Sequence, residues 1–406
     1  MKVISTTGKA WQRLCTRQLG RKRRIEESVR KIIDTVRQNG DEALVRYTRR
    51  FDRVRLSPRQ LRVTEAEKSG AFQHMDPNLV VHLKAAIQNV QVFYGRPRTK
   101  PVRIVDEDGV LLAEKFDPIE RVGVYIPGGT ASLVSTVYMT VIPARQAGVK
   151  EIALCTPPRP DGSVDPNILV VASLLHVEEM YKVGGAQAIA AMAFGTKTIP
   201  KVDKIVGPGN AYVVEAKRQV FGVVDVDTLA GPSEIAIIAN RYTNPQFVLT
   251  DLMAETEHAG GICFLITTSK ALARLARKQI PSGFCVIVKN LEEAAEVANC
   301  LAPEHLQIMV KSPKKLLKRI KHAGAIFLGA YSPVTVGDYI AGPSHVLPTT
   351  GAARVFSGLG VDDFIRRTHI ISYTKGALEK VREPIERLTQ LEGLPRHFES
   401  VKVRLT

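Results

Sequence analysis

The sequence predicts an α/β protein built on two parallel β-sheets. From about residue 121 onward, short β-branched runs alternate with stretches rich in small residues, and strands that alternate with helices are typical of parallel sheets. The alternation falls into two units, at about 122–235 and 236–330. The 406 residues, 45% of them hydrophobic, are enough for two or three domains with ordinary cores. We therefore expect two parallel-sheet domains with small N- and C-terminal extensions.

The predicted elements follow in order along the chain. Residues 1–120 should form helices with one or two strands, and apolar residues at positions 29, 32, 33 and 36 mark an amphipathic helix. A hairpin is expected over 100–118, with its turn at Glu107-Asp108-Gly109. The next expected strands are 122–126, 151–155, 204–206, 234–239, 263–267, 285–288 and 325–328, and the helices between them include 132–148, 185–194, 211–219 and 245–258. The C-terminal part should form a helix, a break at 393–395 and a strand-like tail at 401–405.

The net charge of +17 raises the question of a nucleic-acid partner. The chain has 57 Lys and Arg against 40 Asp and Glu, and its densest basic run is Arg21-Lys22-Arg23-Arg24. No zinc finger, aromatic-rich RNA motif or helix-turn-helix signature accompanies this run, and charge alone indicates only solubility and non-specific attraction. We interpret the run as the solvated face of a helix and expect no nucleic-acid partner.

The sequence also bears on the compartment. No apolar run approaches the roughly 18 residues of a membrane-spanning helix, and the N-terminus becomes polar before any apolar stretch that a secretory signal would need. The five cysteines (15, 155, 263, 285 and 300) include no Cys-x-x-Cys pair, so we expect neither a disulfide framework nor a thiolate zinc site. A cytoplasmic protein without a membrane partner is the expectation.

Three glycine-rich turns are expected to follow strands in the unit 122–235. They lie at 125–130, 183–187 and 206–210. Glycine lets a ligand approach the backbone, and the N-terminus of a following helix offers free N–H groups to a phosphate. The usual Gly-x-Gly-x-x-Gly fingerprint is absent, and each turn alone fits a plain strand–helix connection. Three turns at one sheet edge favour an anionic ligand.

A Glu-x-x-His pair lies near the end of the predicted helix 245–258. Glu255 and His258 are three residues apart and share one face. This is a known metal-ligand spacing, but a single copy fits equally a surface carboxylate and a capping histidine. With Asp338, His397 and one further oxygen, His258 would complete a nitrogen and oxygen site typical of zinc.

A second pair, Glu304-His305, follows a predicted helix. In a loop, both side chains can line a cleft, and such a pair suits general acid–base catalysis near neutral pH. The alternative is a surface turn. Asp338 and His345 add another carboxylate and imidazole in a loop that is rich in glycine.

Taken together, these motifs resemble the histidinol dehydrogenase family, from about residue 25 to the C-terminus. The resemblance is carried by Gly40-Asp41-Glu42-Ala43-Leu44, Val124-Tyr125-Ile126-Pro127-Gly128-Gly129, Val183-Gly184-Gly185-Ala186-Gln187-Ala188, Gly207-Pro208-Gly209-Asn210-Ala211, Ala230-Gly231-Pro232-Ser233-Glu234, Glu257-His258, Ala302-Pro303-Glu304-His305-Leu306, Gly337-Asp338-Tyr339, His345-Val346-Leu347-Pro348-Thr349 and Glu392-Gly393-Leu394 with His397. So many ordered motifs make a chance match implausible.

The resemblance implies a fold of two Rossmann-like domains in the aldehyde-dehydrogenase-like superfamily. It implies an N-terminal basic extension at 1–24, a large discontinuous domain at 25–121 and 236–359, an inserted domain at 122–235, and a C-terminal helix and tail at 360–406. That tail would reach the partner subunit of an intertwined homodimer with a shared active site.

The resemblance also implies roles for individual residues. NAD would be contacted by Tyr125, Gln187 and Asn210. One zinc ion per subunit would be held by Glu255, His258, Asp338 and the partner subunit's His397. Substrate would be contacted by Ser233, Glu255, His258, His305, Asp338, His345, Glu392 and His397. The family usually has Gln where this chain has Glu255, and the chain is shortened at about 276–290, outside the matched motifs.

The implied reaction is the oxidation of L-histidinol to L-histidine through L-histidinal, with two hydride transfers to NAD. His305 would remove the alcohol proton, and Glu304 would activate water for the second step. One alternative is a zinc- and NAD-dependent dehydrogenase of the same superfamily that acts on another small amino alcohol or polyol. Another is a non-enzymatic basic binding protein on the same fold. His345 and Glu392, which would serve the imidazole and amine ends of the substrate, favour histidinol.

Overall fold

The computed structural model describes residues 1–16, 23–73, 75–96, 100–128, 133–258 and 260–406, and the chain divides into two compact units. Unit 1 comprises Met1–Gly95 and Glu120–Asp363, and unit 2 comprises Arg96–Ile119 and Phe364–Thr406. Part of the basic run (21 and 22), part of the first glycine-rich turn (129 and 130) and the start of the predicted helix 132–148 lie outside the described residues.

Unit 1 contains a five-stranded parallel sheet with the order β6-β5-β4-β7-β8. Its strands are β4 (Arg121–Tyr125), β5 (Glu151–Thr156), β6 (Glu179–Lys182), β7 (Lys204–Val206) and β8 (Asp225–Val226). The predicted strands 122–126, 151–155 and 204–206 are confirmed. The sequence analysis missed β6, which lacks an apolar run because charged residues stand at both of its ends. Lys182 is buried there and pairs with Glu67 at 2.6 Å.

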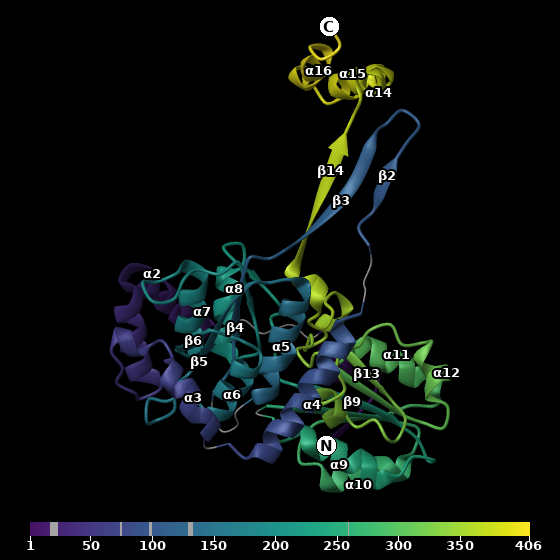
Figure 1. Ribbon diagram of the computed structural model, residues 1–406. Coiled ribbons are helices and arrows are strands. Elements are labelled where there is room, and N and C mark those ends of the chain that lie inside the picture. Colours follow the sequence, from purple (N-terminus) through teal and green to yellow (C-terminus); the bar gives the residue numbers. More distant parts are fainter. Residues whose placement is uncertain (17–22, 74, 97–99, 129–132, 259) are drawn as a thin grey trace. The chain divides into compact units, whose positions relative to one another are not determined.

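Helices cover this sheet (Figure 1). They are α2 (Arg23–Phe51), α3 (Glu65–Gln73), α4 (Pro77–Tyr94), α5 (Val134–Ala147), α6 (Pro166–Leu174), α7 (Gly185–Phe194) and α8 (Ala211–Val220), with a 3-10 turn at Pro58–Gln60. The predicted apolar stripe of α2 is buried in the core together with residues of α7 and α8. Gly40 breaks α2 with a φ of 50°, and Asp41 then accepts hydrogen bonds from the amide and hydroxyl of Thr198. No helix of the described residues is long and apolar enough to span a membrane.

The second sheet of unit 1 is six-stranded and parallel throughout, with the order β1-β11-β10-β9-β12-β13. Its strands are β1 (Lys2–Ile4), β9 (Glu234–Ala239), β10 (Ile262–Thr267), β11 (Phe284–Ile287), β12 (His305–Met309) and β13 (Ala325–Leu328). Along β9, Ala236 and Ile238 face one apolar cluster while Ile235 and Ile237 face another. Both faces are therefore buried, as parallel sheets require.

The helices around this sheet are α1 (Lys9–Cys15), α9 (Pro245–Glu255), α10 (Lys270–Gln279), α11 (Leu291–Leu301), α12 (Pro313–Leu317) and α13 (Val334–Tyr339) (Figure 1). Short 3-10 turns follow at Ala352–Arg354 and Val361–Phe364. The sequence-predicted α/β class with two parallel sheets is confirmed. The segment expected as a basic extension contains β1 and Trp11, which is buried in the core beside the sheet.

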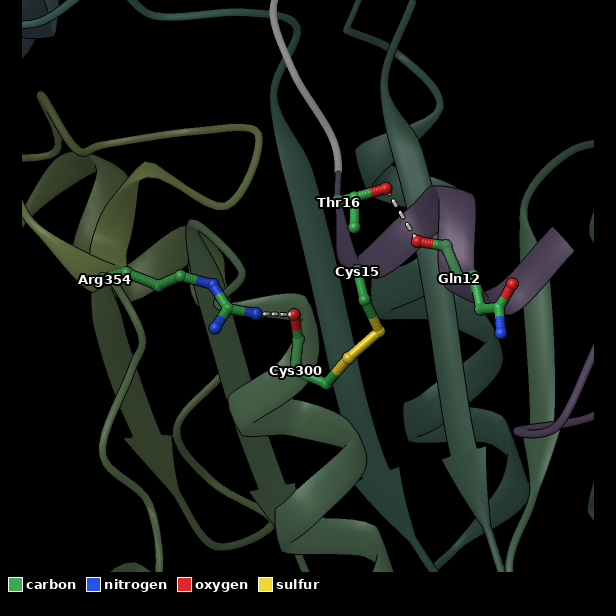
Figure 2. The surroundings of a disulfide bond; sticks show 5 residues. All are labelled: Gln12, Cys15, Thr16, Cys300 and Arg354. Carbon is green, nitrogen blue, oxygen red and sulfur yellow. Dashed lines mark hydrogen bonds between the residues drawn. A yellow bond between two sulfur atoms is a disulfide. The ribbon is translucent and has the colours of Figure 1, made fainter. Parts of the chain in front are cut away.

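A disulfide bond joins Cys15 at the end of α1 to Cys300 in the last turn of α11, with the two Cα atoms 5.3 Å apart. Figure 2 shows the bond together with Arg354, whose guanidinium donates a hydrogen bond to the Cys300 carbonyl. The sequence analysis predicts no disulfide framework and did not identify this single bond. The two residues are 285 positions apart, so no local spacing could indicate that the fold brings them together. The other cysteines, Cys155, Cys263 and Cys285, are buried thiols.

Unit 2 contains an antiparallel sheet with the order β14-β3-β2 and three helices. Its elements are β2 (Arg103–Val105), β3 (Leu111–Pro118), β14 (Ile365–Ser372), α14 (Lys375–Lys380), α15 (Arg382–Leu391) and α16 (Pro395–Lys402). The predicted hairpin is confirmed: Asp106 caps its turn by accepting from the amides of Asp108 and Val110. The predicted strand-like tail was wrong, because Pro395 starts a helix there and the following residues form turns.

Candidate functional site

The three glycine-rich turns meet at one edge of the five-stranded sheet and line a single cavity of about 1140 Å³. Tyr125 ends β4, the second turn leads from β6 into α7, and Asn210 lies between β7 and α8. These positions are the carboxyl ends of parallel strands, where open α/β sheets bind their ligands. The described part of the first turn contributes Gly128 to the same wall. The structure therefore brings the three predicted cofactor residues, Tyr125, Gln187 and Asn210, into one cavity.

Each of these three side chains is held by its neighbours. The Tyr125 hydroxyl accepts a hydrogen bond from the Gly185 amide at 2.9 Å, and burial raises the pKa of Tyr125. Asn210 caps α8 by accepting from the amides of Tyr212 and Val213. Gln187 is 1% exposed, and its Oε1 has no hydrogen-bond partner among the described residues. An enclosed acceptor of this kind fits a ligand that supplies a donor, such as a ribose hydroxyl or an amide.

Residues of α2 also line this cavity, which was not predicted. They include the basic side chains Arg24, Lys31 and Arg50, which suit a phosphate-bearing ligand, and the acidic side chains Glu27 and Asp34. Asp52, at the end of the helix, also lines the cavity, and burial raises the pKa of its carboxyl to about 6. The signal for the basic residues was present in the charge pattern of α2, which we had assigned to a solvated face. Nothing in the local sequence indicated that Asp52 would line this cavity.

The Glu304-His305 pair lies at the amino end of β12, directly beside the start of β9. Ala302 ends α11 in the left-handed conformation (φ 45°), and Pro303 separates the helix from the pair. Glu304 and His305 are 7% and 4% exposed. The alternative of a surface turn was therefore wrong.

Hydrogen bonds orient both side chains of the pair. Glu304 Oε2 accepts from the Ser233 hydroxyl at 2.9 Å and from the Glu234 amide at 3.0 Å. The His305 Nδ1 lies 3.2 Å from the Glu234 carbonyl oxygen. Since a carbonyl only accepts, Nδ1 carries the proton and Nε2 is the basic nitrogen. Nε2 is buried, lies 3.7 Å from the nearer Asp338 oxygen, and has no hydrogen-bond partner in the described parts of the chain.

Burial dominates the ionisation of the pair. Loss of solvation raises the pKa of Glu304 well above its ordinary value, although the hydrogen bonds from Glu234 and Ser233 oppose the shift. The same effect lowers the pKa of His305 to about 3. Near neutral pH the imidazole is consequently uncharged, which is the form that accepts a proton.

The predicted Glu255–His258 pair lies at the end of α9. The helix begins with the Asn244 cap and ends at Glu255, and His258 stands in the following turn, where its amide bonds to the Glu255 carbonyl. Glu255 is 4% exposed, burial raises its pKa to about 7, and its Oε1 is unpartnered within the described residues. His258 is exposed. The alternative of a surface carboxylate was wrong for Glu255.

Asp338 lies on the short helix α13 and not in a loop as predicted. The glycine before it serves close packing: a Cβ on Gly337 would lie 2.7 Å from the Phe327 ring. Burial raises the pKa of Asp338 to about 6. Its backbone carbonyl lies 2.8 Å from Nδ1 of His345, whose Nε2 is 3.2 Å from the Thr136 hydroxyl.

A cavity of about 570 Å³ brings the predicted substrate residues His305, Asp338 and His345 together. The ring of Phe327 and the backbone around Gly324 complete part of its wall. Its size suits a small molecule of a few rings or branches. Glu392 and His397 belong to unit 2, where Glu392 ends α15 and His397 lies on α16.

The predicted metal ligands fit zinc in donor type. Glu255 contributes an enclosed carboxylate oxygen that has no hydrogen-bond partner in the described part of the chain, and Asp338 and His258 add a carboxylate and an imidazole. Besides burial, the charge of Asp338 raises the pKa of Glu255, and that of His258 lowers the pKa of His305. Among the described residues, no three His, Cys, Asp or Glu side chains are already grouped to hold an ion. The ligand set stays a prediction.

Comparison with known proteins identifies the family. The family model for histidinol dehydrogenase matches residues 15–405. The chain is 43% identical over 417 aligned positions to the histidinol dehydrogenase of Clostridium acetobutylicum, covering 98% of this chain and 96% of the relative. It is 44% identical over 401 positions to that of Bacillus cereus, covering 94% and 92%. The crystal structure of histidinol dehydrogenase from Elizabethkingia anophelis matches with a TM-score of 0.93 and 34% identity, covering 100% and 98%. The chain therefore belongs to the histidinol dehydrogenase family and is an oxidoreductase that acts on histidinol.

Proposed function

We propose that the protein oxidises L-histidinol to L-histidine through L-histidinal, in two hydride transfers to NAD, with a zinc ion at the substrate site. The observation that carries this proposal is the buried His305 imidazole. Its basic Nε2 is unpartnered within the described residues, and the side chain lines the smaller cavity together with Asp338 and His345. A neutral imidazole held by its other nitrogen is suited to accept the proton of an alcohol.

In the first oxidation, His305 Nε2 takes the hydroxyl proton of histidinol as the hydride leaves the adjacent carbon. NAD supplies the hydride acceptor in both oxidations, and the cavity around Tyr125, Gln187 and Asn210 would hold it. The Glu234 carbonyl holds Nδ1–H and keeps the ring in the tautomer that the step needs. The product is the aldehyde, which has lost two electrons and two hydrogens.

In the second oxidation, Glu304 takes a proton from water as the water oxygen bonds to the aldehyde carbon, and the protonated His305 returns its proton to the carbonyl oxygen. The neutral imidazole then takes a hydroxyl proton from the hydrate as the hydride passes to a second NAD, which leaves the acid. Burial raises the pKa of Glu304 and makes its carboxylate a stronger base toward water, while the hydrogen bonds that Ser233 and the Glu234 amide donate to Oε2 oppose that rise.

Zinc, where bound, would act as a template that orients the substrate. The residues that would hold it are Glu255, His258, Asp338 and the partner subunit's His397. Glu255 is a carboxylate where the family usually has an amide. Its Oε1, which has no hydrogen-bond partner among the residues that the structure describes, supports its place in this set.

Stoichiometry and chelation test the proposed function. We expect about two NADH per L-histidinol consumed, since each oxidation transfers one hydride. Treatment with a chelator should remove most of the turnover, and added Zn²⁺ should restore it. The measurement is NADH absorbance against histidinol and histidine quantified by chromatography. A ratio of one, or full activity after the metal has been removed, would contradict the proposal.

We also propose a homodimer in which unit 2 reaches the partner. Large apolar side chains on unit 2 are exposed in the single chain, and Leu391 and Ile371 are the most exposed of them, at 83% and 69%. Ile104, Leu388 and Val403 are also more than half exposed. Apolar surface of this kind marks a protein interface, and a second copy of the chain would cover it.

Mixing two inactive variants tests the shared site. His305→Asn and His397→Ala chains should each be nearly inactive, and co-refolding them in equal amounts should restore about a quarter of the parent activity. Half of the dimers would then be mixed, and one of the two sites in each would combine the intact halves. Activity is measured after each variant is refolded alone and after both are refolded together. A mixture no more active than its parts would show that His397 acts within its own chain or not at all.

We propose that the enzyme works in the cytoplasm, without a nucleic-acid or membrane partner. This part of the proposal rests on the sequence pattern. Because disulfides are rare in reducing compartments, the oxidation state of Cys15 and Cys300 in the cell tests the proposed cytoplasmic location directly.

A further inference from the structure

We propose that Glu234 is a positioning residue that holds Glu304 and His305 in place for both oxidations. The inference rests on the proposed roles of that pair and extends them to a residue that lines neither cavity. Glu234 opens β9 beside the first residue of β12 and is fully buried.

Glu234 contacts both members of the pair through different atoms. Its amide donates to Glu304 Oε2 at 3.0 Å, and its carbonyl accepts from His305 Nδ1 at 3.2 Å. Its side-chain Oε1 accepts from the Glu304 amide at 3.3 Å. The main chain of Glu234 therefore orients the two catalytic side chains, and its carboxylate holds the main chain that carries one of them.

The same carboxylate oxygen also holds a third segment. Oε1 accepts from the Thr350 amide at 3.0 Å, and Thr350 has a positive φ of 57°, which side-chain-bearing residues rarely adopt. The neighbouring Thr349 accepts from the Gly231 amide, directly before the 232–234 turn into β9. Glu234 thus joins the segments 231–234, 302–305 and 349–350 at one point.

The carboxylate of Glu234 stands in an otherwise apolar setting. The rest of β9 is apolar, and β9 lies between β10 and β12 in the sheet with both of its faces covered. Burying a carboxylate in such a place costs free energy, and the hydrogen bonds that it accepts from the Glu304 and Thr350 amides offset that cost. The same hydrogen bonds fix the main chain at Glu304. A shift of about 1 Å at reacting groups costs on the order of 10²-fold in rate.

Three substitutions separate the hydrogen-bonding role from bulk and charge. Glu234→Gln keeps an oxygen at the same reach and should retain kcat within about fivefold. Glu234→Asp keeps the charge but withdraws the oxygen by one methylene, and should lose roughly tenfold or more in kcat. Glu234→Ala leaves both amides without their acceptor and should lose about 10²-fold. Because Glu234 does not line the substrate cavity, KM for histidinol should change by less than about threefold in all three.

Ile237→Ala is the matched control. Ile237 lies on the same strand, is fully buried, and faces an apolar cluster that contains neither Glu304 nor His305. It should lower the melting temperature while leaving kcat near that of the parent. If Glu234→Asp and Glu234→Ala lose no more kcat than Ile237→Ala at equal folded fraction, Glu234 is merely structural. If Glu234→Gln loses as much as Glu234→Ala, the oxygen acceptor is not what matters. Either result overturns the proposal.

A spectroscopic measurement tests Glu234 without substrate, metal or NAD. In the parent enzyme labelled with ¹⁵N-histidine, His305 should give the signals of a single neutral tautomer with the proton on Nδ1. Glu234→Asp should broaden or mix these signals, and Glu234→Gln should preserve them. Unchanged His305 signals in Glu234→Asp would contradict the positioning role. NADH stoichiometry in the parent decides the proposed reaction separately, so the two can fail independently.

Discussion

Replacing His305 by Asn should slow histidinol oxidation by about 10²–10⁴-fold, the usual value of a positioned general base. Asparagine can still donate a hydrogen bond toward the Glu234 carbonyl, which now lies 3.2 Å from Nδ1. It places no basic nitrogen where Nε2 now lies beside Asp338. Because the base serves both oxidations, turnover of histidinol and of histidinal should fall together. Stopped-flow NADH absorbance with each substrate measures the two losses.

Glu304→Gln provides the contrast to that variant. Glutamine keeps the acceptor that Ser233 and the Glu234 amide use but cannot take a proton from water. It should therefore slow the oxidation of histidinal more than that of histidinol. His82→Asn, at an exposed position on α4, is the control for histidine loss and should leave both rates unchanged. Equal losses in both half-reactions for Glu304→Gln would refute the division of roles.

Removing the Cys15–Cys300 disulfide should lower the free energy of unfolding by about 4–5 kcal/mol, at the upper end of the range for such bonds. The bond closes a loop across 285 positions, and the chain-entropy contribution of a cross-link grows with loop length. It also fixes α1 to the last turn of α11. The variant is Cys15→Ser with Cys300→Ser, and denaturant unfolding with and without a reductant is the measurement.

Reductant should destabilise the parent to nearly the level of the double serine variant and should have no effect on that variant. Cys155→Ala is the matched control, because it removes a buried thiol that forms no disulfide. Its stability should not depend on reductant. Identical unfolding curves for the parent with and without reductant would show that the bond is absent or contributes nothing in solution.

Much of unit 1 could be predicted because its signals are local. The buried strands β4, β5, β9 and β10 are apolar runs bounded by turns, and the apolar spacing of α2 marked its buried face. In contrast, β12 begins with His305 and carries Gln307 in its middle, so its run of apolar residues is interrupted. β1 forms a strand because it pairs with β11. The local sequence does not indicate such a long-range pairing.

The same distinction holds for the site. Glu304, His305 and Asp338 could be found from residue type and motif, and the cofactor turns from their glycines. Gly337 misled the prediction for its segment, because there glycine makes room for the Phe327 ring inside a helix. Glu234 and Asp52 could not be singled out from the sequence, since the hydrogen bonds of Glu234 and the burial of Asp52 arise only in the fold.

The proposed catalytic pair, Glu304 and His305, lies at the amino end of its strand. The two ends of the strands in this sheet therefore differ in how strongly the proposed function constrains their residues. Ser233 and Glu304 precede their strands, whereas the loops at 240–244 and 310–312 leave the opposite ends of β9 and β12. Those distal loops carry none of the residues to which we assign a role in binding or converting histidinol. We therefore expect substitutions there to be tolerated, and a fluorophore or an affinity tag attached there to leave the proposed chemistry intact.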